Sequence, residues 1–600
     1  MFNRVKSLFS FGTTSKKRLL LKLITVLILA YGFKKVAVWL SGWFRSFKLL
    51  KKAQKKQFEK MSNTIKEIEL LIRNNASKFP DADLMSKIIQ ADVTELIDML
   101  NKGKTTSVQL LLVFLHRCAS IGIRLNAITE FNYTEAWVIA EECDRRRFET
   151  SDLPCLYGIP VSVKNNYIMR ATDSSMGMIS KYGNNDEEDG LLMQVIKEQF
   201  GAIPFVKTNV PTGIIGSECI NYVYGPALSS YSPHRTPGGS SSGEAALISS
   251  GCSPLGFGTD AAGSIRTPCL FSGIYGFMIT PNRVTIKGIN NFAKGGHDHV
   301  KVYIGPMAKS VRDCALVVQN LVSNEFMYSN DFYLEHSVWN RKLTDKSKFT
   351  IAVFPESDLF EMTDPQKRVM KMTISKLSEN GHSIVAWDYP NSFKAIELFV
   401  RIANQLMSVF VKEFEDDFLG GEAQMMRTFE TTPGWMKVLG SYLGKRYLKS
   451  ERLRKMLEMV ERQTVEEFMK NFEVLQVLID EIHRYFDQHQ IDAILMPGLS
   501  VAYKHGSAQL LGSTHFGHIF PNAARLCAGT VPVDTMKPNE DVFSDKFEDY
   551  ITSAIRENLK DGVGLPLGVQ ICAPKNRDEV CLKVMAEIEN CFKFRKLNIE

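Results

Sequence analysis

Two short loops rich in glycine and serine carry the residues best suited to chemistry. The first, "TPGGSSSGEAALISSG" (236–251), runs into a predicted helix of small residues, whose first turn offers free N–H groups. The second, "GFGTDAAGSIRTP" (256–268), contains a tight turn that ends at Ser264. Consecutive N–H groups in that turn can converge on one oxygen as an oxyanion hole, and they belong to Ala261, Ala262, Gly263 and Ser264. The two loops therefore point to acyl transfer by a serine.

Another arrangement of the same residues is a nucleophile elbow. "GSSSG" (239–243) matches G-x-S-x-G with Ser241 at its centre. An elbow needs a strand leading directly into the turn, whereas the proline-bearing "SPHRTPGG" (232–239) precedes this one. Histidines follow downstream, so an ordinary Ser–His–acid triad stays open.

The sequence points to no metal or organic cofactor. It contains neither a Walker phosphate loop nor an H-E-x-x-H pattern. "HDH" (297–299) and the pair His515 and His518 lack a convincing set of further ligands, so we interpret these histidines as structural.

The elements that must position the loops are strands interleaved with helices. Short apolar, β-branched runs include "GIPVSVK" (158–164), "GAIPFVKTNV" (201–210), "FTIAVFP" (349–355), "DAILMP" (492–497) and "GLPLGVQIC" (564–572). This alternation predicts an α/β fold with helices covering a largely parallel or mixed sheet. Ser240 and Ser264 lie 24 residues apart, enough for a helix and a strand to bring the two loops together. No Pro/Gly/Ser-rich linker follows residue 105, so we expect one large domain.

The N-terminal arm differs from the rest of the chain in charge. Residues 1–60 hold fifteen Lys/Arg and one acidic residue, Glu59, whereas the remainder holds 58 basic and 65 acidic residues. The arm also contains "KRLLLKLITVLILAYGFKK" (17–35), with an uninterrupted apolar run of eleven residues, Leu23–Phe33. A spanning helix needs about 20. We predict a membrane anchor in 1–60, spanning or lying in one leaflet, with the membrane rather than nucleic acid as its partner.

The anchor sets the expected domain limits and location. Lys34 and Lys35, not a small-residue cleavage site, follow the apolar run, so we expect the arm to be retained. Positive charge is denser after the run, which favours a body in the cytosol. We divide the chain into the arm (1–60), a helical lead-in (61–105) and a hydrolase domain (106–600). Within 430–460, "WMKVLGSYLGKRYLK" (435–449) predicts an amphipathic helix, either packed on the body or forming a second membrane contact.

Together these motifs resemble the amidase signature family. Its hallmark is a GGSSxG loop followed about two dozen residues later by GTDxxGSIR-P. Further matches appear in family order across roughly 125–575: "YGIPVSVKNN" (157–166), "GAIPFVKTNVP" (201–211), "GPMAKSVRD" (305–313), "AILMP" (493–497) and "GLPLGVQ" (564–570). The resemblance implies a single amidase-signature domain with a central twisted mixed sheet. Within the family, the chain is most similar to membrane-anchored members that hydrolyse fatty acid amides.

The resemblance implies a Ser–Ser–Lys triad. Ser264 would be the nucleophile, Ser240 a bridging serine after a cis peptide bond, and Lys164 the general base. A lysine has a pKa of about 10.4 in water, so the site must desolvate Lys164 to keep it neutral. Ser240 would then carry protons between the other two. Asp260 and Arg266 are expected to brace the nucleophile loop, and Ser241 to form a hydrogen bond within the site.

Three departures from the family pattern bear on rate and substrate more than on fold. Ala262 stands where two glycines usually precede the nucleophile, Ser242 replaces a frequent glycine, and "GFMITPNR" (276–283) replaces G-x-K-P-T. The Cβ of Ala262 disfavours a positive φ and narrows the space over the oxyanion.

The expected function is a membrane-associated serine hydrolase on endomembranes that cleaves fatty acid amides, namely N-acylethanolamines and primary fatty amides. One alternative is a monoacylglycerol or fatty ester hydrolase with the same triad. Another is a catalytically weak lipid-binding scaffold. A second copy of the chain, in a homodimer, is a further expected partner.

Overall fold

The computed structural model describes residues 14–149, 152–291, 299–414, 417–432 and 451–594, with the backbone alone over 14–43. Eleven strands form one sheet in the order β1-β3-β2-β4-β6-β5-β10-β11-β9-β7-β8. Strand β2 pairs in parallel with β3 and β4, and β7 with β8 and β9, whereas the other pairs are antiparallel. The predicted α/β fold with a mixed sheet is confirmed. The strands are β1 Ile128–Phe131, β2 Pro160–Lys164, β3 Ile203–Thr208, β4 Leu255–Asp260, β5 Tyr275–Met278, β6 Tyr303–Ala308, β7 Thr350–Val353, β8 Ser383–Ala386, β9 Ala493–Pro497, β10 Cys527–Thr535 and β11 Pro566–Ala573.

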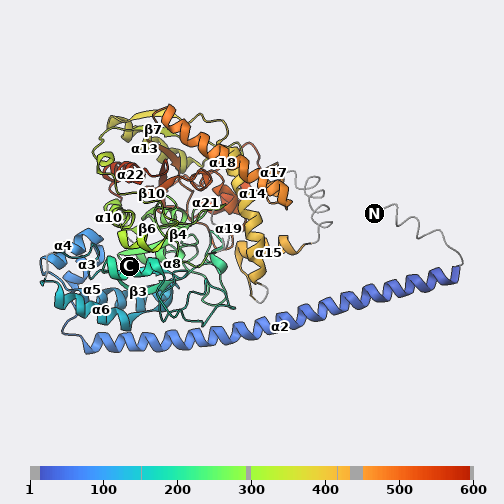
Figure 1. Cartoon of the computed structure of the whole chain (residues 1–600), viewed down its shortest axis with the longest axis horizontal. Helices are drawn as coiled ribbons and strands as arrows, with labels where there is room; N and C mark the ends of the chain where they lie inside the picture. Colours follow the sequence, from blue (N-terminus) through green and yellow to red (C-terminus); the bar gives the residue numbers. More distant parts are fainter. Residues whose placement is uncertain (1–13, 150–151, 292–298, 415–416, 433–450, 595–600) are drawn as a thin grey trace.

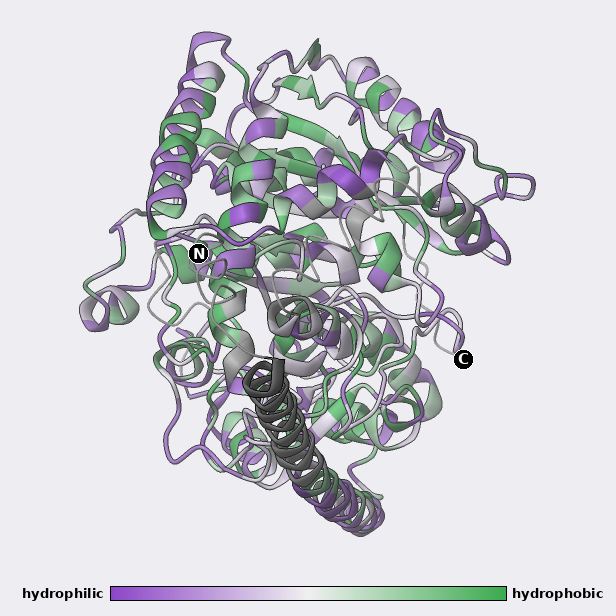
Figure 2. Cartoon of the chain, turned by 90° about the vertical axis from the view of Figure 1, so that its right-hand side faces the viewer, coloured by the Kyte–Doolittle hydropathy of each residue, from purple (hydrophilic) through white to green (hydrophobic). Residues whose placement is uncertain are grey.

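Helices surround the sheet. Helices α8 and α9 pack on each other, α8 over β2 and β4 and α9 over β5, β10 and β11, while α10, α13 and α22 pack on β6, β10 and β11. Hydrophobic residues concentrate on the central strands and hydrophilic residues on the outer helices and loops (Figure 2). The helices are α2 Thr14–Asn74, α3 Ala82–Gln90, α4 Val93–Asn101, α5 Ser107–Arg117, α6 Tyr133–Arg146, α7 Leu191–Gln194, α8 Ser242–Ser249, α9 Arg266–Ser272, α10 Val311–Val322, α11 Glu325–Asn330, α12 Arg341–Thr344, α13 Asp364–Glu379, α14 Ser392–Phe410, α15 Gly421–Thr431, α17 Glu451–Met459, α18 Val465–Gln488, α19 Ala508–Leu511, α20 Phe520–Ala523, α21 Tyr550–Leu559 and α22 Asp578–Phe592.

The parallel strands β2, β3 and β4 position the candidate site residue Lys164 and the residues around it. Every residue of the three strands is buried, as expected for parallel strands covered on both faces. Because they run in the same direction, their last residues lie at one edge of the sheet. Those residues are Lys164, Thr208 and Asp260.

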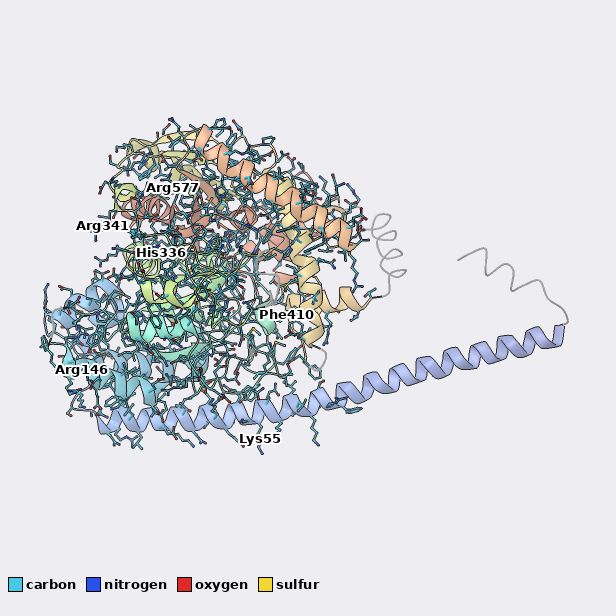
Figure 3. All side chains as sticks on the ribbon, viewed as in Figure 1. Lys55, Arg146, His336, Arg341, Phe410 and Arg577 are labelled. Carbon is cyan, nitrogen blue, oxygen red and sulfur yellow. The ribbon has the colours of Figure 1, made fainter. Side chains whose placement is uncertain are left out.

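Helix α2 carries the N-terminal arm. Its C-terminal part lies along the body, where Leu50, Ala53 and Ile68 are buried and the Gln57 side chain donates to the carbonyl of Thr129 at 2.8 Å. Its N-terminal part extends beyond the body (Figure 1), and side chains such as Lys55 project away from the body (Figure 3). Among the described residues, no helix is both long enough and apolar enough to cross a membrane.

Two features singled out in the sequence lie wholly or partly outside the described residues. The amphipathic stretch 435–449, within the candidate region 430–460, falls entirely in 433–450, between α15 and α17. The first two residues of "HDH" fall in 292–298. The third, His299, packs against the rings of Phe468 and Phe472, as a structural histidine does.

Candidate active site

Lys164 ends β2 and is fully buried. Its Nζ contacts the Oγ of Ser240 at 2.8 Å, and the Oγ1 and carbonyl oxygen of Thr259 at 2.8 and 3.2 Å. Thr259 belongs to β4, and Ser240 belongs to residues 236–241, which lead into α8 and are called the serine loop below. The structure thus brings together Lys164 and Ser240, which lie 76 residues apart in the chain.

Burial lowers the pKa of Lys164 to about 7, against the opposing effect of the nearby Asp260 and Glu244. The charged form loses its hydration in this position, and no carboxylate among the described residues forms an ion pair with it. A substantial fraction of the amine is therefore neutral near pH 7, as a general base requires.

The serine loop depends on glycine to approach its neighbours. The peptide bond between Gly239 and Ser240 is cis. Gly238 has φ +91°, and a Cβ there would lie 2.7 Å from the Cα of Pro268. A Cβ on Gly239 would lie 2.4 Å from the carbonyl oxygen of Gly216. A side chain at Gly238 would push the serine loop away from Pro268, and one at Gly239 would push it away from Gly216.

Residues 261–265, between β4 and α9, are called the nucleophile loop after the role expected for Ser264, and Asp260 organises this loop. Its carboxylate accepts N–H groups from Gly263 at 2.7 Å and Ile265 at 3.0 Å, and the Nε of Arg266 at 3.1 Å. Arg266 and these N–H groups hold the pKa of Asp260 far below its usual range despite burial. Asp260 therefore contacts this loop directly and Arg266 pairs with Asp260, as expected from the sequence.

Ser264 is half-buried at the end of this loop. The N–H of Ser241 donates to the carbonyl oxygen of Ser264 at 3.1 Å, which joins the serine loop to the nucleophile loop. Ser241 also donates its hydroxyl to the carbonyl of Thr259 at 3.4 Å.

Four N–H groups were expected at the oxyanion hole. That of Gly263 donates to Asp260, whereas those of Ala261, Ala262 and Ser264 form no hydrogen bond within the described part of the chain. Gly263 has φ +107°, while Ala262 is not among the residues with positive φ. The departure at Ala262 is therefore compatible with this loop, because the left-handed conformation falls on the following glycine.

Glu244 and Thr259 were not singled out from the sequence. Glu244 is fully buried on α8 and accepts the hydroxyls of Ser162 and Thr208. Burial raises its pKa to about 8, so its carboxyl is mainly protonated at pH 7. Gly256 makes room for it, since a Cβ there would lie 1.8 Å from Oε2. The only sequence signal for Thr259 was its place in "GTD".

The structure does not support the nucleophile elbow. No strand leads into Ser241, which follows an irregular segment. Among the described residues, no histidine hydrogen-bonds to Ser241 or Ser264. The same residues contain no cluster of three His, Cys, Asp or Glu side chains suited to a metal ion.

A comparison with protein families identifies the class. The sequence model described as Amidase matches residues 109–582, so this chain belongs to the amidase family and is an amide hydrolase. The strands of the sheet and the Lys164–Ser240 contact described above fall within the matched region.

Individual relatives narrow the resemblance. The chain is 27% identical over 525 residues to the fatty-acid amide hydrolase 1 of Sus scrofa, covering 85% of this chain and 88% of that protein. It is 26% identical over 507 residues to the fatty acid amide hydrolase 1 of Caenorhabditis elegans, covering 83% and 87%. A solved structure of a fatty acid amide hydrolase matches the fold with a TM-score of 0.73 at 21% identity, covering 92% of this chain and 95% of that one. The chain is thus an amidase-signature hydrolase related to fatty acid amide hydrolases.

Proposed function

We propose that this protein is a membrane-associated serine hydrolase that releases fatty acids from fatty acid amides through Lys164, Ser240 and Ser264. The observation that carries the proposal is the 2.8 Å contact between the buried Lys164 amine and the Ser240 hydroxyl. A lysine whose pKa is lowered to about 7 and whose partner is a hydroxyl is suited to accept a proton from it.

The hydrogen bonds around Lys164 fit a neutral amine. The Thr259 carbonyl can only accept, so one amine N–H is directed to it. The Ser240 hydroxyl can donate to the nitrogen lone pair. In the first step, the Ser264 oxygen forms a bond to the amide carbon while its proton passes to Ser240, and the Ser240 proton passes to Lys164.

The negative charge then develops on the former carbonyl oxygen. We assign its stabilisation to the N–H groups of Ala261, Ala262 and Ser264, since Gly263 already donates to Asp260. When the C–N bond breaks, the Ser240 hydroxyl gives its proton to the leaving nitrogen, and Lys164 returns its proton to Ser240. Water attacks the acyl-enzyme by the same relay, and the fatty acid and a regenerated Ser264 hydroxyl result.

The lipid substrate and the membrane are supported by two independent features. Two relatives that align with 85% and 83% of this chain are named as fatty acid amide hydrolases. The basic, apolar arm 1–60 precedes the catalytic domain, and the N-terminal part of α2, which belongs to this arm, extends beyond the body. We propose that the arm holds the body at an endomembrane from the cytosolic side, so that an acyl chain passes from the bilayer to Ser264.

The test uses the purified full chain, wild type and Ser264→Ala. A fluorophosphonate probe is expected to label the wild type but not the variant, with loss of oleamide hydrolysis. An oleoyl amide and the matching oleoyl glycerol ester are then compared by kcat/KM. Absence of labelling in folded wild type would overturn the serine mechanism, and a dominant ester activity would overturn the amide assignment.

A further inference from the structure

Glu422 lies in the first turn of α15, and its buried side chain reaches Ser217, 205 residues earlier in the chain. Its Oε1 accepts the backbone N–H of Ser217 at 2.8 Å and the hydroxyl of Ser217 at 2.6 Å. Away from water, such hydrogen bonds are stronger than they are at the surface. Glu422 therefore holds the peptide group between residues 216 and 217 by its N–H.

The carbonyl of the same peptide group faces the serine loop. A Cβ built on Gly239 would lie 2.4 Å from the carbonyl oxygen of Gly216, so this oxygen packs directly on the residue before Ser240. Because a peptide group is planar, fixing its N–H also fixes the direction of its carbonyl. One rigid peptide group thus connects Glu422 to the serine loop.

Two glycines allow α15 to approach this closely. Gly216 has φ +140°, and a Cβ there would lie 2.8 Å from Oε2 of Glu422. A Cβ on Gly420, the residue before α15, would lie 2.2 Å from Cγ2 of Ile220. The start of α15 is therefore packed against the segment that supports the serine loop, with no space for a side chain between them.

The role of Ser240 depends on exact placement. Its Oγ lies 2.8 Å from Nζ of Lys164, and in the proposed relay it must also exchange a proton with Ser264. A shift of about 1 Å in a reacting group can cost on the order of 100-fold in rate. A residue that fixes the support behind Ser240 therefore affects the rate without touching the substrate.

We propose that Glu422 is a positioning residue for the proton relay. Its carboxyl orients the peptide group between residues 216 and 217, and this peptide group keeps the Ser240 hydroxyl within reach of Lys164. The inference rests on the proposed function, in which Ser240 gives its proton to the leaving nitrogen.

The test compares an amide and an activated ester of the same acid, oleamide and 4-nitrophenyl oleate. The nitrogen that leaves oleamide must receive a proton, whereas 4-nitrophenolate leaves without one. Their kcat/KM ratio is independent of how much of the protein is folded. Glu422→Ala should lower kcat for oleamide by about 10- to 100-fold with KM within about threefold, and the amide-to-ester ratio by at least about threefold.

Two further variants keep a polar group at this position. Glu422→Gln has an amide oxygen that can accept the same two hydrogen bonds, so it should restore most of kcat and of the amide-to-ester ratio. Glu422→Asp keeps the carboxyl but shortens its reach by one methylene, so it should lower the ratio by an intermediate factor. It decides the test if the alanine variant does not fold.

Glu218→Ala is the matched control. Glu218 is also buried and follows Ser217 directly, but its carboxyl binds His505 and Gly506. This variant should lose stability against urea and keep the amide-to-ester ratio. An unchanged ratio in the folded Glu422 variants, or an equal fall in Glu218→Ala, would refute the role of Glu422. If the wild type hydrolyses neither substrate, the proposed function fails instead, so the two failures are distinguishable.

Discussion

Lys164 and Lys207 lie at the C-terminal ends of adjacent parallel strands, and both are fully buried. The register pairs Lys164 with Thr208 and Val163 with Lys207. Because successive side chains of a strand alternate between its faces, the two lysines point to opposite faces of the sheet. One face holds the serine loop, and the other holds a polar cluster around Ser174.

The direct hydrogen-bond partners of both lysines are uncharged, but the carboxyl groups around the two lysines differ. The Nζ of Lys207 donates to the carbonyl of Tyr167 at 2.8 Å and to Ser174 at 2.6 Å, and Ser174 in turn donates to Asp186. Burial lowers the pKa of Lys207 to about 8, while nearby carboxylates, with Asp186 foremost, act against this shift. On the Lys164 face, Asp260 is engaged by Arg266 and Glu244 is mainly protonated at pH 7. Two equally buried lysines thus differ in their surroundings, and we interpret Lys207 as structural and Lys164 as the proposed general base.

Replacing each lysine by methionine gives the largest expected contrast. Lys164→Met removes the proposed base, so kcat/KM should fall by about 10²- to 10⁴-fold. Lys207→Met removes two hydrogen bonds and a positive charge from a buried acidic cluster, so the free energy of unfolding should fall by about 2–4 kcal/mol. Amide hydrolysis and urea denaturation measure the two effects.

The cross-comparison serves as the control. Lys164→Met should remain folded, and Lys207→Met should retain kcat/KM within about threefold for each folded molecule, because its side chain faces away from Ser264. Equal losses of activity in both variants would show that the two faces of the sheet are not functionally distinct.

This contrast could not be predicted from local sequence. "GIPVSVK" and "AIPFVK" are both apolar runs ending in lysine, and Lys164 was chosen through the family resemblance. The buried strands and the mixed sheet follow from apolar periodicity, which is a local signal. The partners of Lys164 are 76 and 95 residues away in sequence, and only the assembled sheet shows which hydroxyls they present.

The same limit explains the residues that were missed. The importance of Glu244 appears only when Gly256 is seen to leave room for its carboxyl. Glu422 carried no local signal, because its partner Ser217 lies 205 residues earlier in the chain. The expected N-terminal anchor depends on residues 17–43, whose side chains are not described, so it stays a prediction.

The pH dependence of the rate tests the assignment of the base. Since the pKa of Lys164 is lowered to about 7, kcat/KM should rise with pH through about 7 as the amine loses its proton. The unfolded lysine keeps its proton to about pH 10.4, so the unfolded state binds more protons between about 7 and 10.4 and stability should rise with pH there. Lys207→Met is expected to keep the rate limb near 7. A rate limb that shifts in this variant would contradict the separation of the two lysines.

The smallest expected effect on kcat/KM is that of replacing Glu244, whose carboxyl lies near the proposed base Lys164. At pH 7 its carboxyl is mainly protonated, so Glu244→Gln should change kcat/KM by less than about threefold. Because burial raises its pKa to about 8 from an unfolded value of about 4.3, the native state binds more protons in that interval. The contribution of Glu244 to the stability of the wild type should therefore fall as the pH rises from about 4.3 to 8, opposite in sign to the effect of Lys164.

Urea denaturation at pH 5 and pH 8 measures this effect. The Glu244→Gln variant should gain stability relative to the wild type as the pH rises. If the free energies of unfolding of the two proteins differ by the same amount at pH 5 and pH 8, Glu244 is already ionised at pH 7. Lys164 would then have a nearby carboxylate, as Lys207 does, and this difference between the two lysines would disappear.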